Sequence, residues 1–306
     1  MEACATHAPM ASVCGRVFRA TLPTFAYHRA ETVAEALRLL AKYRGKAVLL
    51  AGGTDVLVQM RTGKRIPVAV IDIKRIPALA GGIRLERGGR IEIGALTTLG
   101  DIERSAELGK QAPLLVRAVA TMASPQVRNR GTVGGNLCNA APSADTAPPL
   151  LALDASVRLV GPRGRRTLPL GEFFAGPGQT VLRGKEVLGA ILIPRLPAGL
   201  RGAFRKHGVR EAMECAVVSV AVAVVKERGT IRQARVVLGA VAATPLRVPV
   251  AEALLVGRTG GPLDILAAAG EAAAAARPIT DVRGSQEYRR EMVRCLVRRA
   301  LEEVLG

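Results

Sequence analysis

The spacing of apolar residues predicts helices and strands that alternate irregularly along the first two thirds of the chain. Residues 32–43 show helical spacing, with Thr32 placed as an N-cap and Glu35 three residues later as the partner in a capping box. Apolar runs predict strands at 46–50, 68–73, 90–93 and 186–194. Further helices are predicted at 97–107 and 114–123.

The pattern changes after Pro197, which suggests a second domain. Residues 216–225 and 230–242 form two apolar runs around a polar turn, as expected of an antiparallel hairpin. The remaining chain is rich in alanine and predicts helices at 267–276 and 288–304. We therefore divide the chain into a flexible tail (1–20), a first domain (21–197) and a C-terminal domain (198–306).

Two glycine-rich segments are the candidate ligand-binding features. Gly52-Gly53-Thr54-Asp55 directly follows the predicted strand 46–50. Residues 126–150 lack any regular period and contain Gly134-Gly135-Asn136, so we expect an ordered loop pressed against a ligand. Glycine lets backbone N–H groups approach and converge on an anion, which is how protein loops hold a pyrophosphate.

Neither glycine segment matches the common nucleotide motifs. The G-x-G-x-x-G pattern with an acidic residue about twenty positions later is missing, as is a loop that ends in Gly-Lys-Ser/Thr. A Rossmann site and a nucleotide-hydrolase site are therefore disfavoured.

The charge of +19, from 44 Lys and Arg against 25 Asp and Glu, points to an acidic partner. Nucleic acid is one alternative, but the basic residues are scattered and the chain has no Trp, three Tyr and five Phe to stack on bases. We favour acidic partner subunits or an anionic cofactor, and expect no nucleic acid.

The five cysteines predict neither a disulfide framework nor a metal site. Their number is odd, and no CxxC or Cys/His cluster joins them, so we expect a reducing cytoplasm and no metal or iron–sulfur cluster. Cys4 and Cys14 are assigned to the flexible tail. No apolar run approaches the roughly 18 residues of a membrane span, so none is expected.

Four motifs, in order along the chain, carry a resemblance to a known family. They are AGGTD, IGALTTLGDIE, SPQVRNRGTVGGNLCNAAPSADTAPPLLALDA and EYRREMVRCLVRRAL. Together they resemble the FAD-binding medium subunits of molybdenum hydroxylases, such as carbon monoxide dehydrogenases and xanthine dehydrogenases. The resemblance extends from about Phe25 to Leu301.

The resemblance implies a fold and a set of FAD contacts. The fold is of the α+β class: a FAD-binding domain of the molybdopterin dehydrogenase (PCMH) type with two α+β subdomains, followed by a small domain with a three-stranded antiparallel sheet and helices. The implied cofactor-binding residues are Ala51, Gly52, Gly53, Thr54, Asp55, Val56, Thr132, Gly134, Gly135, Asn136, Asp145, Leu188 and Lys206. No residue is assigned a catalytic role.

Three of these residues keep an alternative interpretation. Asp145 holds a polar part of the cofactor or caps the following helix. Leu188 packs on the flavin ring or belongs to the core. Lys206 stabilises a reduced, anionic flavin or is a solvated surface charge. Where relatives commonly carry an acidic residue followed by isoleucine and alanine, this chain has Glu214-Cys215-Ala216.

The resemblance also implies a place in a complex. A large molybdopterin-binding subunit oxidises the substrate, a small [2Fe–2S] subunit relays the electrons, and this chain passes them through FAD to an acceptor such as NAD or quinone. A dimer of heterotrimers is implied. The alternatives are a self-contained FAD-dependent oxidoreductase of the same fold and a basic scaffold protein without a cofactor.

Overall fold

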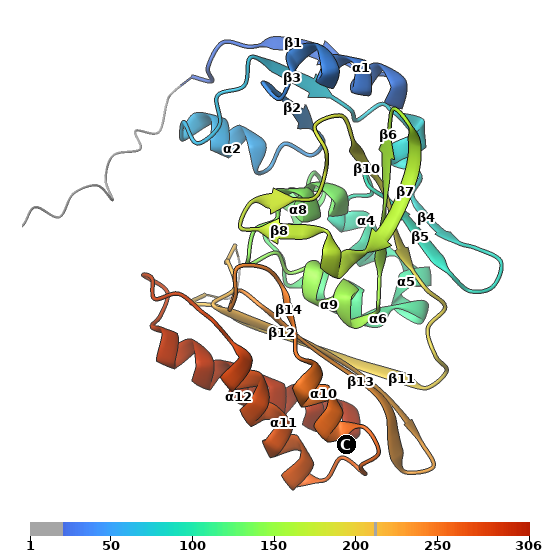
Figure 1. The fold of residues 1–306 in the computed structure, drawn as a ribbon, viewed down its shortest axis with the longest axis vertical. Coiled ribbons are helices and arrows are strands. Elements are labelled where there is room, and N and C mark those ends of the chain that lie inside the picture. The colour runs from blue at the N-terminus through green and yellow to red at the C-terminus, as the bar shows by residue number, and fades with distance from the viewer. Residues whose placement is uncertain (1–20, 211–212) are drawn as a thin grey trace, which may run out of the picture.

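The computed structural model describes residues 21–210 and 213–306, which form three packed units along the long axis of the molecule (Figure 1). The predicted tail, with Cys4 and Cys14, lies outside the described residues. The mixture of sheets and helices confirms the predicted α+β class.

The first unit is a parallel three-stranded sheet with helices packed beside it. Its strands, in the order β1-β3-β2, are β1 (Ala26–Arg29), β3 (Ala69–Asp72) and β2 (Ala47–Leu50). Its helices are α1 (Val33–Tyr43), α2 (Val56–Arg61) and α3 (Pro77–Ala80). Thr32 caps α1 as predicted, accepting from the Glu35 N–H at 3.1 Å. The Glu35 carboxylate, however, accepts from the N–H of Glu31 rather than that of Thr32.

The second unit is an antiparallel five-stranded sheet in the order β4-β5-β10-β6-β7. Its strands are β4 (Ile83–Leu85), β5 (Ile91–Gly94), β10 (Val187–Ile193), β6 (Ser156–Gly161) and β7 (Gly164–Pro169). A 3₁₀ turn (Leu170–Glu172) leads from β7 into a small ribbon of β8 (Phe174–Gly176) and β9 (Gln179–Thr180). Every residue of β10 is buried, because this strand lies at the centre of the sheet.

The predicted loop 126–150 is instead largely helical, and this expectation was wrong. It folds into α7 (Pro125–Arg128), α8 (Val133–Asn139) and α9 (Ala147–Ala152). The predicted helix 97–107 is likewise two helices, α4 (Leu99–Arg104) and α5 (Ala106–Gln111), followed by α6 (Pro113–Ala120). The side chains of Ser105, Ser124 and Thr132 cap three of these helices. Helices of one or two turns are too short for apolar periodicity to reveal them.

The third unit is an antiparallel sheet with helices on one side. Its strands are β11 (Leu200–His207), β12 (Val218–Glu227), β13 (Thr230–Gly239) and β14 (Leu246–Arg247). Its helices are α10 (Pro249–Leu255), α11 (Pro262–Ala275) and α12 (Gln286–Leu305). The predicted hairpin is confirmed, with Arg228 and Gly229 at φ 47° and 81° in a tight turn. The short strand β14 is a fourth strand, where three were expected.

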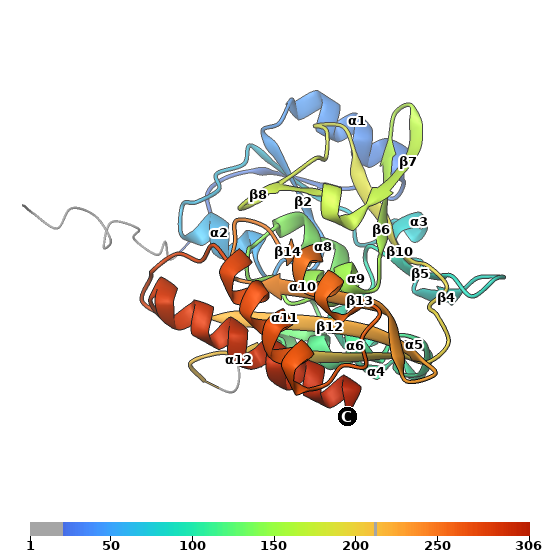
Figure 2. The same cartoon turned by 60° about the horizontal axis from the view of Figure 1, so that its bottom comes forward.

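Strand β12 is buried on both faces, which explains its uninterrupted apolar sequence (Figure 2). Val220 and Val222 belong to the core shared with α10, α11 and α12. Ala221 and Ala223 belong instead to the core of the second unit, with residues of α6 and α9. The sheet of the third unit is therefore packed between the helices of that unit on one face and the second unit on the other. No helix within the described ranges is long and apolar enough to cross a membrane.

Candidate functional site

The segment between β2 and α2 presents a row of free backbone donors. Within residues 21–210 and 213–306, the N–H groups of Gly52, Gly53, Thr54, Asp55 and Val56 donate no hydrogen bond. Gly53 has φ 81°, a left-handed conformation that glycine adopts without strain. Successive unpaired N–H groups at such a turn form a concave anion site. This row is the feature that the glycines of AGGTD predicted.

Gly52 is also a point at which the first and second units touch closely. A Cβ atom at Gly52 would lie 2.7 Å from the carbonyl carbon of Arg130 and 2.9 Å from the Cα of Gly131. Nearby, the Gln59 side-chain amide of α2 donates to the Asn139 Oδ1 of α8 at 2.8 Å. The two glycine-rich segments, far apart in sequence, therefore lie side by side.

The second glycine segment is built differently from the first. The N–H of Gly134 donates to the Ala95 carbonyl at 3.0 Å, and that of Gly135 donates to the Thr132 Oγ1 at 3.0 Å. A Cβ at Gly134 would lie 2.8 Å from that of Ala95. These N–H groups are thus bonded inside the protein, contrary to the expectation that both glycine segments present donors to an anion. Gly134 instead allows α8 to pack closely against Ala95.

Thr132→Ala is expected to destabilise the fold by about 1 kcal/mol, because it removes the N-cap acceptor of α8. Thr132→Ser retains the hydroxyl and is expected to lie within a few tenths of a kcal/mol of the wild type. Urea unfolding of both variants measures the difference. Equal losses in the two variants would show that the threonine methyl, rather than the cap, stabilises this region.

Asp145 and Lys206 form a buried ion pair that joins the second unit to the third. The Lys206 Nζ lies 2.7 Å from the Asp145 Oδ2, and the side chains are only 9% and 5% exposed. The same ammonium donates to the carbonyls of Thr121 and Glu214 at 3.3 and 3.0 Å. Lys206 is therefore not a solvated surface charge. Asp145 does not cap α9 either, since that position belongs to Thr146.

The second carboxylate oxygen of Asp145 has no hydrogen-bond partner. Its Oδ1 is buried and unsatisfied, and a buried acceptor in that state costs free energy unless a ligand or water supplies a donor. Burial raises the pKa of Asp145, and the charge of Lys206 opposes that rise. The hydroxyl of the next residue, Thr146, donates to the Asn136 Oδ1 at 2.5 Å, which connects α8 to the start of α9.

The other predicted residues lie around these features. Leu188 is 5% exposed and belongs to the core of the second unit. Ala51 and Val56 are half-buried on either side of the free N–H row. Desolvation raises the pKa of the Asp55 carboxyl although part of its side chain is exposed, and Lys64 opposes this.

Sequence reasoning did not single out Arg130 or Ala95. The Arg130 backbone contacts Gly52, and its exposed side chain forms no ion pair within the described part of the chain. Ala95 supplies the carbonyl that holds Gly134. Arg130 lies inside the RNRGT motif, and a cation next to a glycine there could have indicated a residue near an anion. Ala95 had no such signal, because its role is a backbone contact.

These features fit a dinucleotide with a pyrophosphate. The free N–H row suits the phosphates, the glycine at residue 52 permits a close approach of the two segments, and the orphaned Asp145 oxygen suits a hydroxyl or N–H donor of the ligand.

Comparison with known proteins agrees with this geometry. Residues 23–196 match the family model "FAD binding domain in molybdopterin dehydrogenase", and residues 203–304 match "CO dehydrogenase flavoprotein C-terminal domain". The chain is 38% identical to the carbon monoxide dehydrogenase medium chain of Hydrogenophaga pseudoflava over 91% of this chain and 96% of that one. It is 34% identical to the xanthine dehydrogenase FAD-binding subunit of Escherichia coli O157:H7 over 92% and 96%.

The fold matches a solved relative over nearly its whole length. The structure of the H. pseudoflava carbon monoxide dehydrogenase that lacks the Mo-pyranopterin moiety superposes with a TM-score of 0.89. It is 38% identical and covers 92% of this chain and 97% of that chain. The chain therefore belongs to the family of FAD-binding medium subunits of the carbon monoxide and xanthine dehydrogenases.

Proposed function

We propose that this chain is the electron-transfer subunit of a molybdenum-containing hydroxylase or dehydrogenase, with FAD as its cofactor. The observation that carries the proposal is the row of five unpaired N–H groups from Gly52 to Val56, held against Arg130 and Gly131. Relatives over more than nine tenths of the chain are named as medium or FAD-binding subunits of such enzymes.

The residues of this chain bind and position the cofactor. The N–H groups of residues 52–56 hold the pyrophosphate. Asp145 accepts a hydrogen bond from a polar group of the cofactor through Oδ1, while Lys206 fixes its other oxygen. Leu188 supplies apolar surface. Bound FAD supplies the ability to accept electrons singly and to pass on two.

No step of this function needs an acid, base or nucleophile from the chain. His28 and His207 contact the hydroxyls of Tyr43 and Tyr288, at 2.6 and 2.8 Å. We propose that the substrate is oxidised in a large molybdopterin-binding subunit and that electrons arrive from a small [2Fe–2S] subunit. NAD or a quinone then accepts them, in a cytoplasmic dimer of heterotrimers.

Purification of the tagged chain from its native host tests this proposal. We expect a yellow complex with two further polypeptides, the visible spectrum of FAD, and both molybdenum and iron by elemental analysis. A chain that purifies alone, yellow, and oxidises a small molecule would replace the relay with a self-contained flavoenzyme. A colourless chain without metal would contradict both.

A further inference from the structure

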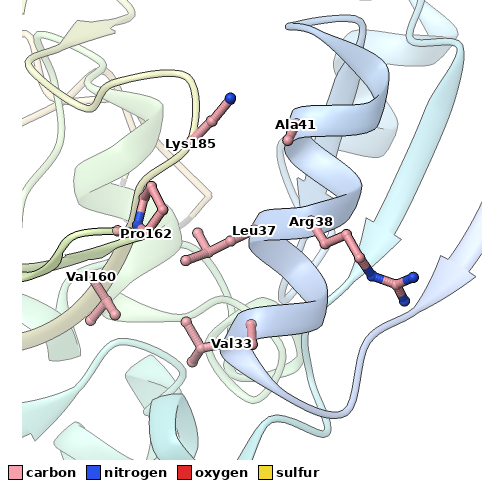
Figure 3. A pocket seen from close by; sticks show the side chains of 9 residues that line it. Val33, Leu37, Arg38, Ala41, Val160, Pro162 and Lys185 are labelled. Carbon is pink, nitrogen blue, oxygen red and sulfur yellow. The ribbon is translucent and has the colours of Figure 1, made fainter.

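Two adjoining hollows lie away from the flavin residues. The first lies at the seam between the first and second units (Figure 3), and the second lies beside it, on residues of the second unit alone. Their volumes are about 490 and 430 Å³, and both are lined by Gly161, Pro162 and Lys185. None of the residues assigned to FAD lines either one. Each is within the size range of small-molecule sites, roughly 300–1,000 Å³.

The first hollow is mainly apolar. Figure 3 shows Val33 and Leu37 of α1 pointing toward Val160 and Pro162, which come from β6 and the turn after it. Ala41 lines the same hollow one turn further along α1. One wall thus comes from each unit.

The second hollow is cationic. Arg163, Arg165, Arg183 and Lys185 line it, are all exposed, and form no ion pair within the two described ranges. The only carboxylate in its lining, Glu186, is occupied by Arg166 at 2.8 Å and by the N–H of Arg183 at 2.9 Å. Cations that line the same hollow repel one another, and an anion would relieve that repulsion.

The backbone adds donors beside these side chains. The turn 183–186 is closed by the Glu186 N–H donating to the Arg183 carbonyl at 2.9 Å. The N–H groups of Gly184 and Lys185 inside this turn donate no hydrogen bond within the described part of the chain. Gly184 lacks a Cβ and has open space beside it, so an anion can approach these donors.

We propose that these hollows form a second ligand site for a small organic polyanion of the nucleotide type. The apolar body of the ligand lies between α1 and Pro162, and its phosphates contact the arginines and the free N–H groups of the second hollow. Arginine favours this chemistry because its planar fork binds phosphate oxygens in pairs.

Such a ligand would connect the two units that also hold the flavin. The ligand contacts α1 of the first unit and the β6–β7 turn of the second. At the glycine segments, the same two units contact each other through Gly52 and Arg130. A molecule that bridges the two units stabilises their packed arrangement by mass action. The site is thus suited to regulation by a phosphorylated metabolite.

Calorimetric titration of ATP into the full chain saturated with FAD tests the site. We expect R165E/K185E to weaken ATP binding at least tenfold, since each charge-assisted hydrogen bond contributes about a factor of ten. Arg299→Glu is the control, because Arg299 is an exposed arginine on α12 that forms no ion pair with the described residues and does not line either hollow. It should leave ATP affinity unchanged.

Ala41→Phe tests the apolar hollow independently of the cationic one. The larger side chain fills the apolar hollow, so ATP binding should fall while binding of inorganic triphosphate is retained. The absence of ATP binding, equal affinities in R165E/K185E and R299E, or capture of polyglutamate in preference to ATP would each overturn the proposal. Flavin content is measured separately, so loss of FAD with retained ATP binding counts against the proposed function alone.

Discussion

Gly52→Ala is expected to yield protein with at least tenfold less bound FAD than the wild type. The added Cβ meets backbone atoms of Arg130 and Gly131 at 2.7 and 2.9 Å, and backbone cannot rotate away as a side chain can. The two segments must therefore separate by several tenths of an ångström or more. Overpacking of this kind costs about 1–3 kcal/mol, and it also displaces the N–H row from the facing segment.

The control for this prediction is Gly109→Ala on the exposed surface of α5. A Cβ there meets nothing within 4 Å, so the change should keep FAD and gain up to about 1 kcal/mol from helix propensity. Flavin absorbance per polypeptide and urea unfolding measure the two effects. Full flavin content in the Gly52 variant would show that close contact with residues 130 and 131 is not needed for binding.

Lys206→Met is expected to destabilise the protein by about 3–5 kcal/mol, because it leaves the Asp145 carboxylate buried without its cation. Asp145→Asn should cost less, since the ammonium keeps the carbonyls of Thr121 and Glu214 as acceptors. The double variant K206M/D145N should recover much of the loss, because no buried charge remains. The free energy of unfolding of all three variants, measured in urea, tests this order.

The pH dependence gives this prediction a second test. Burial raises the pKa of Asp145 above its ordinary 3.8, so its contribution to stability is fully present below that value and is lost as pH rises through the raised pKa. Removing Lys206 removes the positive charge that opposes the rise in the pKa of Asp145. The loss of stability with rising pH then continues to higher pH. Lys206→Met should therefore be more destabilising at mildly alkaline than at mildly acidic pH. A penalty independent of pH would show that lost packing, not charge, is responsible.

Sequence patterns predicted the elements whose signals are local in the sequence. Helix α1 and the β12–β13 hairpin are examples, because their caps, turn residues and apolar runs are local in sequence. The short helices α7 and α8 were missed because capping side chains and tertiary contacts, rather than periodicity, stabilise them.

The candidate site was predictable in its composition but not in its contacts. Glycines predicted a close approach, yet only those of the first segment leave their N–H groups free, and Gly134 contacts Ala95. The pairing of Asp145 with Lys206 joins residues 61 positions apart. A local pattern cannot reveal it, because it depends on how β11 packs against the second unit.

The burial of β12 on both faces has a consequence for how the polypeptide can be divided. Two separate family models meet near the start of β11, but Ala221 and Ala223 of the C-terminal portion complete the core of the portion before it. A fragment that ends between the two models would expose the apolar surface of α6 and α9 to water. The two portions that match separate family models are thus interdependent in folding. An exchange of either portion between relatives must preserve the core residues that they share.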